Sequence, residues 1–146
     1  MAVPNRRILA GALGGALGSM AMKAVVRFCD PNAFGLSSQT DAKAARVVFG
    51  EGLDQRTAEQ IGSAVHYGFG IVTGIGYAIA SRTYTVVRTS RGIGFGAGLW
   101  LIGDELAVSA ARLESPCAAS VFSHVSALAA HLIYGVIVEV CVSRAD

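Results

Sequence analysis

Ionisable side chains recur inside apolar stretches of the sequence, and they are the residues that could do chemistry. Carboxylates and imidazoles within a membrane commonly form proton relays or ligand sites. One lysine, two adjacent acids and three histidines make up this set: Lys23, His66, Asp104, Glu105, His124 and His131. Each needs pairing, protonation or contact with water, because a charge at the centre of a membrane helix costs about 2.5–3.5 kcal/mol on the mildest insertion scale.

These six residues are expected to form a polar layer across the bundle. At the helical rise, five of them lie roughly 6–10 Å below one membrane boundary, and His131 lies roughly 16 Å below it. Lys23 is expected to pair with Asp104 or Glu105, with His66 or His124 hydrogen-bonded nearby. Because the two acids are adjacent on a helix, one is expected to face the bundle interior and the other a neighbouring helix or subunit.

Three interpretations of the layer remain open. It could be a hydrogen-bonded network that fixes helix register, a pathway for protons or small solutes, or a metal or haem site built on His66 and His131. No Glu-x-x-His pair is present, and the two histidines differ in depth. No metal or other cofactor is therefore predicted. No enzyme is predicted either, because Ser63 and Ser109 lack the context of a nucleophile elbow.

The elements that must position these residues are long apolar helices. The chain has 146 residues, of which 53% are hydrophobic and only 15% are charged, whereas soluble domains average about a quarter charged. Runs of about 20 apolar residues can cross a bilayer and are too long for strands in a small domain. The sequence predicts an all-α integral membrane four-helix bundle in one domain, residues 1–146, with helices over 8–28, 61–80, 92–111 and 120–142.

The first connection is expected to contain a short amphipathic helix over residues 42–49. Asp41 can cap its start, and Gly50 or Gly52 can end it. Val47, Val48 and Phe49 would let this helix lie on the membrane surface. Asp54 is the predicted N-cap of the second spanning helix.

Glycines at four-residue spacing mark the faces through which the helices should pack. In lipid, helices associate by close backbone approach, which glycine permits. We expect this role for Gly11, Gly15, Gly18, Gly62, Gly70, Gly74, Gly94 and Gly98. The first and third helices are both rich in glycine, and the second and fourth each carry a histidine followed closely by Tyr-Gly. This echo suggests two hairpins in a parallel repeat, although chance in a glycine-rich chain is the alternative.

Charge and cysteine positions bear on orientation. Six basic residues fall on each side of the predicted bundle, but the first helix and the short loop over 81–91 favour cytoplasmic N- and C-termini. Cys29 and Cys117 fall at the same side, where either a disulfide or two free thiols can exist.

The third and fourth helices resemble the YagU-like family of uncharacterised bacterial inner-membrane proteins. The similarity rests on Trp100 with Gly103-Asp104-Glu105, on Ser123-His124, on His131 with Tyr134-Gly135, and on His66-Tyr67-Gly68. It implies a bacterial inner-membrane location and no established reaction, so no catalytic residue is carried over.

The function predicted from these features is that of a small multi-pass membrane protein, a structural or accessory subunit of a membrane assembly. Its expected partners are the lipid bilayer and other membrane-protein subunits or further copies of itself. A net charge of +2 without a Lys/Arg run excludes a nucleic-acid partner. The alternatives are a permeation module that uses the Asp/Glu/His layer, and a haem- or metal-binding membrane protein.

Overall fold

The computed structural model describes residues 5–29, 41–108 and 121–145. These residues form helices, and no strand occurs among them. The long helices are α1 (Asn5–Cys29), α3 (Gln55–Thr83) and α5 (Val121–Ser143), and a shorter helix, α4 (Ile93–Trp100), precedes a π-helical segment (Leu101–Val108). Residues 41–49 are also helical. The predicted all-α class is confirmed.

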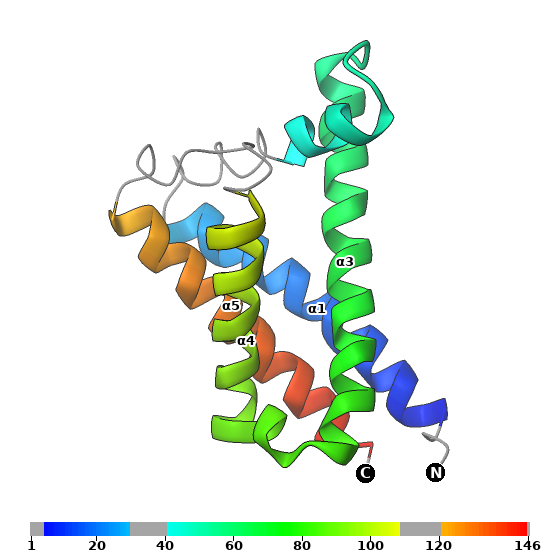
Figure 1. The fold of residues 1–146 in the computed structure, drawn as a ribbon, viewed down its shortest axis with the longest axis vertical. Coiled ribbons are helices and arrows are strands. Elements are labelled where there is room, and N and C mark those ends of the chain that lie inside the picture. Colours follow the sequence, from blue (N-terminus) through cyan, green and yellow to red (C-terminus); the bar gives the residue numbers. More distant parts are fainter. Residues whose placement is uncertain (1–4, 30–40, 109–120, 146) are drawn as a thin grey trace.

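The helices form two consecutive hairpins that run in the same sense. α1 and α4 begin at the end of the molecule where both chain termini lie, and α3 and α5 end there (Figure 1). α1 packs against both α3 and α5, and α4 packs against α5. A 3-10 segment (Thr85–Gly92) turns the chain from α3 into α4. This is the orientation that a parallel repeat requires.

One glycine pair of α1 brings its backbone against α3. A Cβ atom at Gly11 would overlap the backbone of Gly74, and a Cβ at Gly15 would overlap the backbone of Gly70. All four residues were expected at helix contacts. The two helices therefore approach as closely as their main chains allow, as in small-residue packing within membranes.

The second glycine pair of α1 faces α5. A Cβ at Gly14 would lie 3.0 Å from the Cα of Val138, and one at Gly18 would lie 2.5 Å from Cδ2 of the Tyr134 ring. Two overlapping four-residue spacings on one helix thus serve two different neighbours. Because the pairs are offset by three residues, they lie about 60° apart around the helix, so each can meet a different neighbouring helix.

A similar contact joins α4 to α5, but one of its glycines precedes the predicted pair. A Cβ atom at Gly92 would overlap the backbone of Gly135, and a Cβ at Gly96 would overlap the backbone of His131. The positions named from the sequence, Gly94 and Gly98, are not at this contact. Gly94 is exposed, and a Cβ at Gly98 would meet nothing within 4 Å.

Both glycine spacings on α4 look alike in the sequence, and backbone conformation separates them. Gly92 has a φ of 89°, in the left-handed region that suits glycine. It can therefore end the 3-10 segment and lie against α5 at once. The last predicted packing residue, Gly62, lies on α3 against the backbone of Asp41.

The third predicted helix is not a regular α-helix along its length. It changes from α to π hydrogen bonding at Leu101, and residues beyond 108 lie outside the described range. Gly98 and Gly103 flank the change, and glycine weakens α-helical propensity. A π turn adds a residue per turn, so faces and depths calculated from α-helical geometry do not hold at Asp104.

The described part of the first connection, from residue 41 onward, is helical where the sequence predicts a short helix. The helical residues 41–49 end at Gly50, which has a φ of 112° and donates its N–H to the carbonyl of Arg46 at 2.8 Å. Asp54 caps α3 by accepting a hydrogen bond from the Thr57 N–H at 3.0 Å. α3 starts six residues before the predicted apolar stretch, because its first turns are polar and only the cap marks its beginning.

The Asp54 cap should respond to pH. The Thr57 hydrogen bond lowers the pKa of Asp54 below its ordinary value of 3.8. A lowered carboxyl pKa stabilises the fold above the ordinary value, and this contribution is lost as pH falls through the lowered value. Hydrogen exchange in the first turn of α3 should therefore speed up in acid and in Asp54→Ala at neutral pH. Asp54→Asn should keep the turn protected at both acidic and neutral pH. Equal exchange rates in Asp54→Ala and wild type would show that the cap does not stabilise the turn.

Large apolar side chains cover the outside of the helices. Among the described residues no Leu, Ile or Phe is buried. On α1 alone, Leu9, Leu13 and Leu17 are each more than half exposed. The buried residues are mostly glycine, alanine and serine, together with two tyrosines, Met22, Val138, Val142 and the charged Arg7 and Glu139. This inverts the pattern of soluble proteins, whose cores are rich in Ile, Val, Leu and Phe.

Candidate functional site

Several residues assigned to the polar layer make polar contacts with one another or with their neighbours, but the ion pair of Lys23 differs from the one expected. Lys23 of α1 places its Nζ 3.4 Å from Oδ2 of Asp41 and donates to Oγ of Ser63 at 2.9 Å. The same Nζ lies 5.4 Å from the ring centroid of Tyr67. The described partner of Lys23 is thus Asp41, and not Asp104 as one expectation had it.

Lys23 pairs with Asp41 and not with Asp104 because of where the helical residues 41–49 lie. Asp41 packs its main chain against Gly62 of α3, which brings its carboxylate inward beside Lys23. The sequence treats this segment as a surface helix, so Asp41 is assigned to a cap and not to the layer. Its last residues, Val47, Val48 and Phe49, are exposed as expected.

Asp104 pairs with a histidine. Its Oδ2 lies 3.7 Å from Nδ1 of His131, and the same Nδ1 lies 2.9 Å from the carbonyl oxygen of Ala127. A carbonyl can only accept, so Nδ1 carries the proton in this contact.

The remaining layer residues are less fully defined. His66 lies edge-on to Tyr67, with ring centroids 5.8 Å apart, and its Nε2 is buried without a hydrogen-bond partner among the described residues. His124 is half-buried at the start of α5. The side chain of Glu105 lies outside the described part of the structure. The described contacts are therefore the Lys23–Asp41 ion pair and the Asp104–His131 contact, with His66 as a buried polar neighbour.

The Lys23–Asp41 pair makes a testable electrostatic prediction. Burial raises the pKa of Asp41 above 3.8, and the charge and hydrogen bond of Lys23 oppose that rise. In Lys23→Met the opposition is removed, so the pKa of Asp41 should rise further. A raised carboxyl pKa means that this group's contribution to stability falls as pH increases through the raised value. A carbon-13 titration of the carboxyl checks the shift, with exposed Asp54 as the internal control. An unchanged Asp41 would rule out the ion pair.

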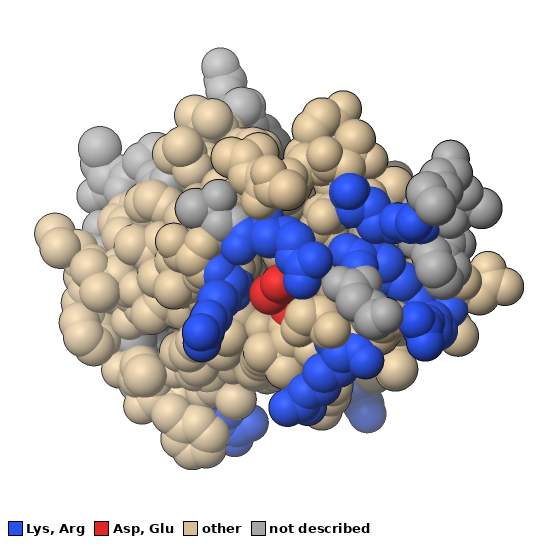
Figure 2. Space-filling model, turned by 90° about the horizontal axis from the view of Figure 1, so that it is seen from below, with Lys and Arg blue, Asp and Glu red and all other residues tan. Residues whose placement is uncertain are grey.

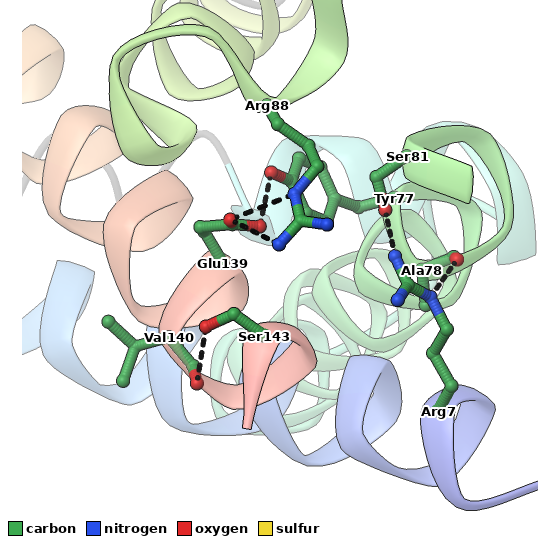
Figure 3. Close-up of polar contacts among 8 residues, drawn as sticks. All are labelled: Arg7, Tyr77, Ala78, Ser81, Arg88, Glu139, Val140 and Ser143. Carbon is green, nitrogen blue, oxygen red and sulfur yellow. Dashed lines mark hydrogen bonds and ion pairs between the residues drawn. The ribbon is translucent and has the colours of Figure 1, made fainter. Parts of the chain in front are cut away.

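A second buried cluster lies at the opposite end of the helices, where the termini lie (Figure 3). Glu139 of α5 is only 8% exposed. Its Oε2 accepts from the Tyr77 hydroxyl at 2.7 Å, and its Oε1 accepts from Nε and Nη2 of Arg88 at 3.1 and 3.0 Å. One carboxylate thus ties together α3, α5 and the segment Thr85–Gly92.

Arg7 fixes α1 to the same end of α3. This arginine is only 4% exposed. Its Nε donates to the carbonyl of Ala78 at 2.9 Å, and its Nη2 donates to the Ser81 hydroxyl at 2.8 Å. The negative end of the α3 dipole favours a cation here. Sequence reasoning used Arg7 only for orientation, since nothing in the spacing links it to residues more than 70 positions away.

A strongly basic face surrounds Glu139. Seen from the end where the termini lie, Lys and Arg side chains ring an acidic group (Figure 2). Residues 1–29 and 60–103 contain no acid, so the carboxylate that Arg88 meets at this face comes from α5. The elements that meet here carry Arg6, Arg7, Arg82, Arg88, Arg91 and Arg144.

A third set of polar contacts lies between the two clusters. The Tyr134 hydroxyl donates to the carbonyl of Gly70 at 2.6 Å and lies 2.7 Å from Oγ1 of Thr73. Tyr134 is fully buried. Its ring passes over Gly18, and a side chain larger than glycine at this position would overlap it.

Metal and disulfide sites receive no support from the described geometry. Within residues 5–29, 41–108 and 121–145, no three His, Cys, Asp or Glu side chains are grouped to hold a metal ion. Cys29 is exposed at the end of α1. Cys117 lies outside the described residues, so its disulfide with Cys29 stays a prediction.

Comparisons with known proteins place the chain in a family without assigning a reaction. No curated protein and no solved structure matches it. One family model, described as a family of unknown function (DUF6789), matches residues 5–146. The match agrees with the expectation of an uncharacterised family, while the YagU-like name is not the one that it carries. Since the match spans nearly the whole sequence, the chain belongs to the DUF6789 family of unknown function.

Proposed function

We propose that this chain is a multi-pass integral membrane protein whose helices face lipid. The observation that carries the proposal is the inverted distribution of side chains, with no buried Leu, Ile or Phe among the described residues. Transfer of one such side chain from water to an apolar environment is worth about 1.5–3 kcal/mol. α1 and α5 are also long and apolar enough to span a membrane, and α3 and the α4 region would complete the bundle.

The interior supports the same proposal. Lipid supplies no hydrophobic drive between helices, so membrane bundles rely on small residues and buried polar contacts. Here three helix pairs meet at glycine contacts, and Glu139, Arg7 and Tyr134 each have hydrogen-bond partners inside. Such an interior would give little hydrophobic stabilisation to a protein dissolved in water, and it suits a protein surrounded by hydrocarbon.

Orientation follows from the basic end. Lys and Arg near helix ends remain on the cytoplasmic side. The arginine-rich face with both termini is therefore proposed to be cytoplasmic. A bacterial inner membrane is the proposed location, supported by the resemblance of the third and fourth helices to YagU-like proteins.

Within the membrane we propose an accessory or assembly role. The buried side chains of Arg7, Tyr134 and Glu139 have hydrogen-bond partners in the interior, and the backbone contacts at Gly11, Gly15 and Gly96 leave little room for a solute. The outside, by contrast, offers an exposed glycine at Gly94 and a half-buried one at Gly98, where a Cβ would meet nothing within 4 Å. A tightly packed interior combined with small residues on the outer helix faces suits a protein that associates with other membrane helices.

Purification of the tagged full chain in a mild detergent tests this role. Mass spectrometry and light scattering should find a stoichiometric membrane partner or a defined oligomer, and Gly98→Leu should weaken that association without unfolding the chain. A monomer without a partner would contradict an accessory role. The absorbance spectrum of the same sample tests the haem alternative, which requires a Soret band.

Proton permeation is the second candidate, favoured by one observation. The buried Nε2 of His66 has no described hydrogen-bond partner. The His66 ring also interacts electrostatically with Lys23 and with His131. Imidazoles beside carboxylates can relay protons. Vesicles that contain the protein and a trapped pH dye should then acidify under a proton gradient, and Asp104→Asn should abolish the flux. Equal rates in empty vesicles would remove this candidate.

A further inference from the structure

An apolar groove of about 320 Å³ runs between α3 and the start of α4. It is lined by Thr73, Gly76, Tyr77, Ala80, Val87 and Phe95. Two of these residues, Tyr77 and Phe95, are in contact with each other, with ring centroids 4.7 Å apart. The α3 lining extends from Thr73 to Ala80, which is about 10 Å of helix. In a membrane this groove would open sideways toward the acyl chains.

One end of the groove is tied to the basic face. Tyr77 lines the groove, and its hydroxyl donates to Glu139, which also holds Arg88. Val87 lines the groove immediately before Arg88 in the chain. Glu139 occupies Nε and Nη2 of Arg88, whose side chain is still 35% exposed. The groove thus combines an apolar floor with a positively charged end.

We propose that this groove binds one acyl chain of an anionic glycerophospholipid, with the lipid phosphate held at the arginines beside the segment Thr85–Gly92. Charge complementarity selects this occupant. The segment carries Arg88 and Arg91, α3 ends with Arg82, and residues 60–103 supply no acid. Basic clusters at the cytoplasmic side of membrane helices attract anionic headgroups in this way.

The dimensions of the groove favour a lipid chain over a helix. A helix with side chains is about 10–12 Å wide. This groove is lined by only six residues, four of them on two turns of α3, and two of the six are aromatic. An unbranched acyl chain can follow such a groove lengthwise. The proposal rests on the membrane insertion proposed above.

Two glycines of α3 provide a matched pair of variants. Gly76 lines the groove, and a Cβ built on it meets nothing within 4 Å. Gly76→Leu should therefore fill the groove without disturbing helix packing. Gly68 has the same open surroundings two turns earlier on α3 and does not line the groove. Gly68→Leu is the control for the added leucine.

The test uses the full chain in vesicles of phosphatidylcholine with phosphatidylglycerol. Alkaline extraction first establishes insertion, and native mass spectrometry then counts the lipids that stay bound after detergent release. Wild type and Gly68→Leu should retain one phosphatidylglycerol in preference to phosphatidylcholine, and Gly76→Leu should lose it. Removal of charge in Arg82→Gln or Arg91→Gln should weaken the preference for phosphatidylglycerol about fivefold each.

Each contrary outcome has a distinct meaning. Complete extraction into the alkaline supernatant would overturn membrane insertion and the lipid site with it. An inserted protein that retains both lipids equally, or that keeps phosphatidylglycerol in Gly76→Leu, would overturn the lipid site alone. A dimer that Gly76→Leu dissociates would make a second copy the occupant, and would also overturn it.

Discussion

Replacement of Glu139 by alanine is expected to destabilise the fold by about 3 kcal/mol. Loss of one partner from a buried ion pair costs about 3–5 kcal/mol, because the other charge is left without compensation. The lower end of that range applies, because Arg88 is partly exposed. The variant also removes the acceptor of the buried Tyr77 hydroxyl. Unfolding in mixed micelles with increasing dodecyl sulfate, followed by circular dichroism, measures the change.

Two further variants separate charge from burial. Glu139→Gln keeps a hydrogen-bond acceptor for Tyr77 and should fall between alanine and wild type. Glu51 is exposed, so Glu51→Ala should change stability by no more than about 0.5 kcal/mol. Equal stability of Glu139→Ala and Glu51→Ala would contradict the view that one carboxylate ties three elements together.

Substitution of Gly15 by leucine is expected to separate α1 from α3. A Cβ at this position would already overlap the backbone of Gly70 and lie 2.9 Å from the Cα of Ile71. Main-chain atoms cannot move aside as a flexible side chain can, so the whole helix must shift. Overpacking of this kind costs about 3 kcal/mol. The same micelle titration measures it, and a disulfide engineered across the two helices should no longer form.

Gly98 supplies the matched control for Gly15. Both residues belong to four-residue glycine spacings in apolar helices, so the sequence treats them alike. A Cβ at Gly98 meets only open space, and Gly98→Leu should leave the stability of the chain close to wild type. Equal damage from both variants would show that glycine is needed for some property other than helix contact.

Much of the fold can be predicted from the sequence, because the sequence features that determine it are local. Apolar runs locate α1 and α5 to within three residues of their ends, and the Asp54 cap explains why α3 begins early. Glycine spacing identifies the contacts at Gly11, Gly15, Gly70 and Gly74. Each of these features depends on a few neighbouring residues.

The partners within the candidate site are less legible because they depend on tertiary packing. Lys23 finds Asp41 only because residues 41–49 fold back against α3. Glu139 and Arg88 are 51 residues apart, and no periodicity connects them. The π-helical segment also moves Asp104 off the face that α-helical geometry assigns to it. A basic end beside a buried acid is the one signal that could have pointed to Glu139.

Spin-label accessibility tests the proposed membrane insertion most directly. Leu13 and Val72 lie mid-way along α1 and α3 and are exposed, so nitroxides placed there in the reconstituted protein should meet lipid. The account predicts strong relaxation by oxygen, which concentrates in hydrocarbon, and weak relaxation by a water-soluble nickel chelate. A label at Glu51 should show the reverse. Strong relaxation by the nickel chelate at Leu13 and Val72 would place these faces in water and contradict the account.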